Sequence, residues 1–86
     1  MPYKLIEELA ELITALAKLY SYKNLSSSQE KSLRKSTKEE IADVKAQIEL
    51  FEEMQGLKGD IDIEERMQQK YNYYKQLWQK SNVKNI

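Results

Sequence analysis

The amino-acid sequence predicts an all-α protein, and three observations support this prediction. Apolar residues recur at helical spacing over residues 3–21, 37–55 and 61–80, whereas no useful length alternates with a period of two. Both glycines of the chain, Gly56 and Gly59, fall between the second and third of these segments. We therefore expect three helices in a single domain over residues 1–86, in which the first two form an antiparallel hairpin.

The first helix is predicted over residues 3–21, directly after Pro2, a residue that suits a first helical turn. Its broad apolar face consists of Leu5, Ile6, Leu9, Leu12, Ile13, Leu16, Leu19 and Tyr20. That arc is wider than the core of three helices needs. Since a chain of 86 residues without cysteine has a thin core and no disulfide, we expect it to gain stability by forming a homo-oligomer.

The second and third helices follow a Ser- and Lys-rich segment, residues 22–36, which we interpret as a loop with at most one helical turn after Ser27. Either Ser36 or Thr37 is expected to cap the second helix, residues 37–55. Either Asp60 or Asp62 is expected to precede the third helix, residues 61–80. The apolar stripe of this last helix consists of Ile63, Met67, Tyr71, Tyr74, Leu77 and Trp78. We expect this stripe to belong to a core or a subunit interface more readily than to stack a base.

Four carboxylates lie on or beside the apolar faces of the first two helices. Glu40 and Asp43 share a face with Ile41, Val44, Ile48, Leu50, Phe51 and Met54, and Glu8 and Glu11 project from one flank of the first helix. An antiparallel arrangement brings the two acidic pairs to one seam. Buried carboxylates need a counter-charge, and no Lys or Arg falls on this stripe. The sequence therefore predicts a Mg²⁺ site, with Mn²⁺ as a substitute, and disfavours Zn²⁺ because the chain has no Cys or His.

Each acidic pair also has a simpler interpretation. Acids near the start of a helix stabilise its dipole, which would account for the first pair and for Glu7. Thr37 and Glu40 have the spacing of a capping box, which would place Glu40 in a first turn for local reasons. Neither interpretation accounts for Asp43, a poor helix former on an apolar face.

Composition excludes several classes of protein. The 14 basic and 14 acidic side chains cancel, which argues against a nucleic-acid binder with a broad basic face. No apolar run approaches the ~20 residues that span a bilayer, and acidic residues interrupt the N-terminal apolar stretch where a signal peptide would need it. We expect no membrane partner and a cytoplasmic location.

The order of the acids resembles a known signature. Glu7-Glu8-Leu9-Ala10-Glu11, followed by Glu40-Ile41-Ala42-Asp43, is similar to the EExxE…ExxD pattern of the all-α nucleoside triphosphate pyrophosphohydrolases, which include the MazG-like enzymes and dimeric dUTPases. The resemblance covers residues 4–55, and the third helix matches only in its length and place. It implies a MazG-like domain, assembled as a dimer or tetramer.

The resemblance implies an enzyme that hydrolyses a nucleoside triphosphate to the monophosphate and pyrophosphate and serves nucleotide-pool sanitation. By position, Glu8, Glu11, Glu40 and Asp43 would bind Mg²⁺, and Glu7 would either lie behind these ligands without binding the ion or help orient the attacking water. Phosphate and base contacts are expected from cationic and aromatic side chains, with Lys18, Lys70, Lys75 and Tyr71 as candidates.

The chain departs from the family in two places. It begins almost at the first acidic motif, where many members carry an earlier helix that reads the base, and it lacks the basic, His-containing C-terminal pattern of the MazG branch. The preferred base and sugar therefore stay open. The alternative interpretation is a small helical interaction module that retains the acids without catalysis.

Overall fold

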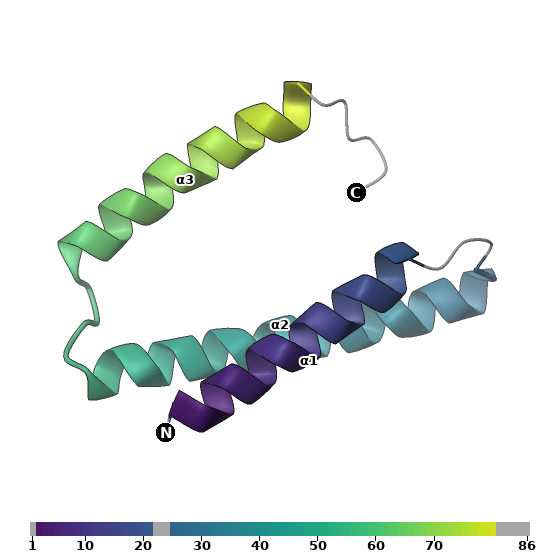
Figure 1. The fold of residues 1–86 in the computed structure, drawn as a ribbon, viewed down its shortest axis with the longest axis horizontal. Helices are drawn as coiled ribbons and strands as arrows, with labels where there is room; N and C mark the ends of the chain where they lie inside the picture. The colour runs from purple at the N-terminus through teal and green to yellow at the C-terminus, as the bar shows by residue number, and fades with distance from the viewer. Residues whose placement is uncertain (1, 22–24, 81–86) are drawn as a thin grey trace. The chain divides into compact units, whose positions relative to one another are not determined.

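A computed structural model describes residues 2–21 and 25–80, and all of the regular structure in these ranges is helical. Helix α1 spans Pro2–Ser21, α2 spans Ser27–Met54 and α3 spans Ile61–Lys80 (Figure 1). The prediction of an all-α protein is confirmed. None of the described helices is both long and apolar enough to cross a membrane.

Helix α2 begins at Ser27, ten residues before the predicted start at residue 37. The predicted loop over residues 22–36 is therefore wrong from Ser27 onward. Its N-cap is Ser26, whose hydroxyl accepts a hydrogen bond from the Gln29 amide at 3.2 Å. The Gln29 side chain in turn accepts from the Ser26 amide at 2.9 Å, which completes a capping box. Residues 22–24 lie outside the described part of the chain.

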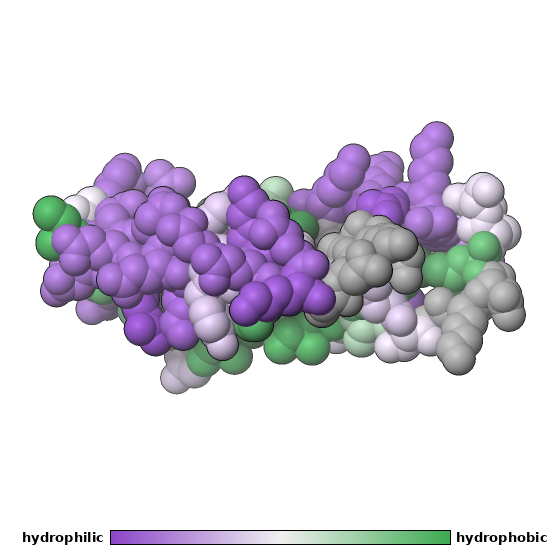
Figure 2. Space-filling view, turned by 90° about the horizontal axis from the view of Figure 1, so that it is seen from above, coloured by the Kyte–Doolittle hydropathy of each residue, from purple (hydrophilic) through white to green (hydrophobic). Residues whose placement is uncertain are grey.

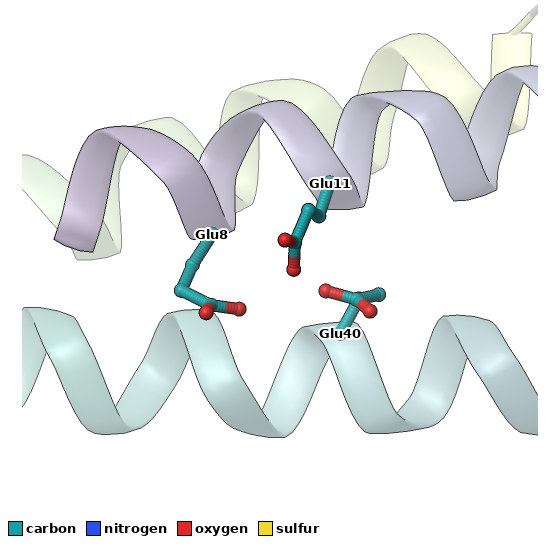
Figure 3. A group of neighbouring side chains, drawn as sticks. All are labelled: Glu8, Glu11 and Glu40. Carbon is teal, nitrogen blue, oxygen red and sulfur yellow. The ribbon is translucent and has the colours of Figure 1, made fainter.

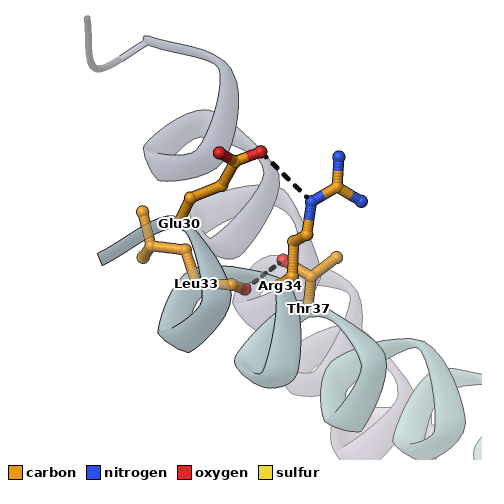
Figure 4. Close-up of polar contacts among 4 residues, drawn as sticks. All are labelled: Glu30, Leu33, Arg34 and Thr37. Carbon is orange, nitrogen blue, oxygen red and sulfur yellow. Dashed lines mark hydrogen bonds and ion pairs between the residues drawn. The ribbon is translucent and has the colours of Figure 1, made fainter. Parts of the chain in front are cut away.

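Two side-chain contacts support the extra turns of α2 (Figure 4). Arg34 and Glu30, one turn apart, form an ion pair at 3.3 Å. Thr37, predicted as a possible cap together with Ser36, instead lies in mid-helix, where its hydroxyl donates to the Leu33 carbonyl at 2.8 Å. The serines and lysines of this segment suggested a loop, although Gln, Glu, Lys, Leu and Arg are all good helix formers.

The connection between α2 and α3 follows the expected glycine pattern. Gly56 (φ 70°) follows the last turn of α2, and Gly59 (φ 75°) forms the tight turn before α3. Asp60 is the residue that caps α3, because its carboxylate accepts from the Ile63 amide at 3.1 Å. Of the two predicted caps, the structure thus selects Asp60.

The chain divides into two compact units, Met1–Gly56 and Leu57–Ile86. In the first unit, α1 lies along α2 and runs in the opposite direction (Figure 1). In the second unit, the side chains of α3 are exposed except for half-buried Ile63 and Lys70. The single domain expected over residues 1–86 stays a prediction.

Helices α1 and α2 meet along a line of buried and half-buried residues, which we call the α1–α2 seam. Its positions alternate in steps of three and four, the spacing at which one face of a helix stays turned toward a partner helix. The seam consists of Leu5, Glu8, Leu12, Ala15 and Leu19 of α1 and Leu33, Thr37, Glu40, Val44, Gln47 and Phe51 of α2. Ala15, Thr37 and Val44 are its buried residues.

Candidate metal centre

Three carboxylates converge between α1 and α2. Glu8 and Glu40 occupy seam positions, and Glu11 lies beside the seam one turn after Glu8. One carboxylate oxygen of each of the three lies within 4.8 Å of those of the other two. Figure 3 shows Glu11 of α1 and Glu40 of α2 pointing toward each other, with Glu8 reaching toward α2 beside them. Antiparallel packing thus joins acids that the sequence separates by residues 12–39.

Two oxygens of this group are buried without a hydrogen-bond partner. They are Oε2 of Glu8 and Oε2 of Glu40, although each side chain as a whole is half-buried. A buried carboxylate oxygen that accepts no hydrogen bond is costly unless it is protonated or a cation binds it. These two oxygens are the feature of the first unit, Met1–Gly56, that most strongly indicates a bound ligand.

The electrostatics of the group agree with its geometry. Burial raises the pKa of the Glu40 carboxyl above its ordinary value, and the charges of Glu11, Glu8 and Asp43 raise it further. Burial also raises the pKa of Glu8, with further increases from the charges of Glu11 and Asp43 and an opposing effect from Lys4. Since Lys4 already pairs with Glu7, whose carboxylate lies 3.6 Å from the Lys4 ammonium, it is not dedicated to the group.

Asp43, the fourth predicted ligand, does not join the group of three in this structure. Its side chain is exposed, and its oxygens are not among those that lie within 4.8 Å of one another. Its charge nevertheless raises the pKa of both Glu8 and Glu40, so it stands at the edge of the same site. Asp43 precedes seam residue Val44, just as Glu11 precedes seam residue Leu12, which places both acids on the same side of the helix pair.

The other predicted site residues have separate surroundings. Glu7, the proposed orienter of water, is exposed and paired with Lys4. Lys18 is exposed in the last turn of α1, and its spacing of seven residues from Glu11 places it on the same side of the helix, ~10 Å along the axis.

The remaining three candidates belong to α3, in the second unit, and are described apart from the acids. The Lys70 ammonium lies over the rings of Tyr73 and Tyr74, at 5.3 and 5.7 Å from their centroids. The Lys75 ammonium lies 5.9 Å from the ring centroid of Tyr71. At these distances both lysines make cation–π contacts within α3, in addition to any contact with phosphate.

One further polar residue lies on the seam without having been singled out from the sequence. Gln47 is half-buried, seven residues after Glu40 and therefore on the same face of α2, two turns away. The spacing of four and then three residues from Glu40 to Val44 to Gln47 places all three on one helix face, and this pattern could have identified Gln47 from the sequence.

The donor set consists only of carboxylate oxygens, which suit a hard divalent cation such as Mg²⁺ or Mn²⁺. The two orphaned buried oxygens fit such an ion. Comparison with known proteins adds no further guidance, because no family model, curated protein or solved structure matches the chain.

Proposed function

We propose that Glu8, Glu11, Glu40 and Asp43 bind Mg²⁺ and that the chain is a nucleoside triphosphate pyrophosphohydrolase. The observation that carries the proposal is the pair of buried, unpartnered oxygens of Glu8 and Glu40 within a group of three carboxylates. The reaction class rests on the resemblance of the acidic signature to MazG-like enzymes. Mn²⁺ is the expected substitute ion.

The proposed reaction requires the protein mainly to position the substrate and the cation and to stabilise charge on the phosphates. A bound divalent cation supplies charge neutralisation on phosphate oxygens and makes a coordinated water more acidic. The four acids hold and orient it on the side of the helix pair where Glu11 and Asp43 lie. Glu7 is proposed to help orient the attacking water, which requires it to exchange its exposed ion pair with Lys4 for that contact.

Substrate contacts are proposed for four residues. Lys18 shares the side of α1 on which Glu11 lies and would bind the distal phosphates as a point charge. Lys70 and Lys75 are candidates for further phosphate contacts, and the 61% exposed ring of Tyr71 is a candidate for stacking on the base. We further propose that the chain acts in the cytoplasm as a homo-oligomer, a dimer or a tetramer.

The test is a profile of pyrophosphate release from each common ribo- and deoxyribonucleoside triphosphate with Mg²⁺. We expect release from at least one nucleotide, and loss of release in Glu40→Gln and Asp43→Asn. Glu49→Gln is the matched control, because Glu49 is exposed and lies nine residues after Glu40, on the opposite face of the same helix. Full activity in both site variants would refute the assigned site, and no release from any nucleotide would refute the enzymatic proposal.

A second candidate function is a helical interaction module that keeps the acids but does not catalyse. The observation that favours it is the large number of exposed apolar side chains on the described helices, such as Ile13 (68%) and Met67 (59%). Under this proposal Mg²⁺ still raises the melting temperature, by mass action, but no nucleotide is hydrolysed.

A further inference from the structure

The charged side chains are segregated along the sequence, although they sum to zero. Residues 39–65 contain ten acidic side chains and two lysines, whereas residues 66–80 contain four basic side chains and no acidic one. The neutrality of the whole chain, which argues against a broad basic face, therefore conceals a short basic segment. This segment makes up most of α3, and its cations are Arg66, Lys70, Lys75 and Lys80.

The same segment is rich in aromatic side chains. Four of the eight aromatic residues of the chain, Tyr71, Tyr73, Tyr74 and Trp78, lie within residues 71–78. All four are exposed within the second unit, by 51% to 61%. At about 100° per residue, Tyr71, Tyr74 and Trp78 project from one face of α3. We call these three residues, together with Lys70 and Lys75, the aromatic–lysine face.

Rings and positive charges adjoin on this face. Tyr71, Tyr74, Lys75 and Trp78 line an open groove of about 340 Å³. Lys75 projects to one side of the row of rings and Lys70 to the other, each by about 70°. The Lys70 ammonium lies 5.7 Å from the ring centroid of Tyr74, and the Lys75 ammonium lies 5.9 Å from that of Tyr71. A ligand on the rings would therefore have a cation on either side.

This combination favours an anionic partner that contains flat rings. An apolar protein surface would take both lysine ammoniums out of water, and residues 66–80 supply no carboxylate to pair with them. Phosphates bring the missing counter-charge. Nucleobases bring flat faces that stack on aromatic side chains whatever the base sequence. In a duplex these faces are already stacked on one another, so a single strand is the form that fits.

Two other anionic partners match the face less well. A lipid surface would need aliphatic side chains to enter it, and Met67 and Leu77 are the only apolar residues of segment 66–80 that are not aromatic. The side of the molecule seen in Figure 2 is mostly hydrophilic, with hydrophobic residues in patches among the polar ones. An acidic protein would pair with the lysines but would leave the rings without a stacking partner.

We propose that the aromatic–lysine face binds single-stranded nucleic acid, with bases stacked on its three rings and phosphates held by its two lysines. Residues 66–80 extend over about 20 Å of helix, the length of about six nucleotides at about 3.4 Å per phosphate. The proposal goes beyond the proposed hydrolysis and does not depend on it. The mononucleotide contacts proposed above for Lys70, Lys75 and Tyr71 are the competing assignment, which the experiment separates.

The first experiment uses Trp78, the single tryptophan of the chain, as a probe located on the face itself. The full chain is titrated with a 12-nucleotide oligothymidylate while tryptophan fluorescence is recorded. We expect quenching with a Kd of about 1–100 µM near physiological salt. Two to four phosphate contacts should make the logarithm of the binding constant fall with that of salt concentration with a slope of about −1.4 to −2.8.

Four results of this titration would overturn the proposal. The first is an absence of quenching, and the second is binding that does not weaken with salt. The third is equal affinity for thymidine triphosphate, which would assign the face to a mononucleotide. The fourth is equally tight binding to vesicles of anionic phospholipid or to polyglutamate, which would assign it to a lipid surface or an acidic protein.

Two variants locate the contacts, with the anisotropy of a labelled oligothymidylate as the readout. Tyr74→Leu removes a stacking ring and should weaken binding at least ~5-fold, whereas Tyr3→Leu, which removes an exposed ring from α1, should not. Lys75→Gln should make the salt slope shallower by about 0.7, whereas Lys45→Gln removes the same charge from an exposed position of α2 and should leave it unchanged. Wild-type binding by both Tyr74→Leu and Lys75→Gln overturns the proposal. If circular dichroism shows that a variant has lost helix, the titration of the wild type decides.

Strand binding and catalysis have separate readouts. If the oligothymidylate quenches Trp78 but no nucleotide releases pyrophosphate, the inference stands and the enzymatic proposal fails. If pyrophosphate is released but the oligothymidylate does not bind, the proposed reaction stands and the inference fails.

Discussion

Replacing Glu40 by glutamine tests two properties of the three carboxylates. They should repel one another in the absence of a cation, and they should bind a divalent cation when it is added. The change keeps the shape of the side chain and removes one of three charges whose oxygens lie within 4.8 Å. Because burial and the charges of Glu11, Glu8 and Asp43 raise the pKa of Glu40, its ionised form is less stable in the folded than in the unfolded chain. In metal-free buffer at mildly alkaline pH, we expect Glu40→Gln to melt at a higher temperature than the wild type.

The same reasoning gives the sign of the pH dependence. A carboxyl whose pKa is raised by folding binds its proton more tightly in the folded chain, so its contribution to stability falls as pH rises through the window above the ordinary value of 4.5. Glu40→Gln lacks this titration. The advantage of the variant over the wild type should therefore grow as pH rises from 4.5 and level off above the raised pKa.

Magnesium should reverse the order of the two proteins. A ligand at about 100 times its Kd stabilises the folded state by about 2.7 kcal/mol. For a chain of this size that corresponds to a rise of about 10–20 °C in melting temperature, at about 4–8 °C per kcal/mol. We expect this rise in the wild type and in the control Glu49→Gln, and little of it in Glu40→Gln.

Thermal unfolding followed by far-ultraviolet circular dichroism, in chelator and then in magnesium, measures both effects. Equal magnesium-dependent shifts in the wild type, Glu49→Gln and Glu40→Gln would refute the reasoning. So would a Glu40→Gln variant that melts below the wild type in chelator.

Three further predictions concern single residues. Ser26→Ala removes the hydroxyl that accepts from the Gln29 amide, so we expect a loss of about 1 kcal/mol in chemical denaturation and faster amide exchange in the first turn of α2. Unchanged exchange there would contradict the cap. Gly59→Ala places a side chain at φ 75° in open space, so only backbone strain remains, and unfolding should show a cost of about 1 kcal/mol. A neutral result would argue against the left-handed turn. Lys18→Gln should raise KM for the nucleotide more than it lowers kcat, because a phosphate clamp acts on the bound substrate; steady-state kinetics would reject this role if KM stayed constant.

The periodicity of the sequence was enough to predict where most of the helices lie. The structure has α1 at Pro2–Ser21 and α3 at Ile61–Lys80, within a residue of the predicted bounds, and it places Asp60 at the cap of α3. These features depend on interactions between residues a few positions apart, which a sequence displays directly. The start of α2 was missed because a serine- and lysine-rich composition outweighed the local capping box of Ser26 and Gln29.

Residue spacing along the chain is enough to predict that it forms helices and that two of them carry acids beside apolar residues. Which acids meet depends on how α1 packs against α2: Glu8 and Glu40 lie on the seam, Glu11 reaches between them, and Asp43 stays at the edge. The same packing leaves one side of the α1 apolar arc exposed. The physical reason is that the spacing within a helix follows from its own backbone, whereas the register and facing of two helices depend on side chains that are distant in sequence and pack only once the chain has folded.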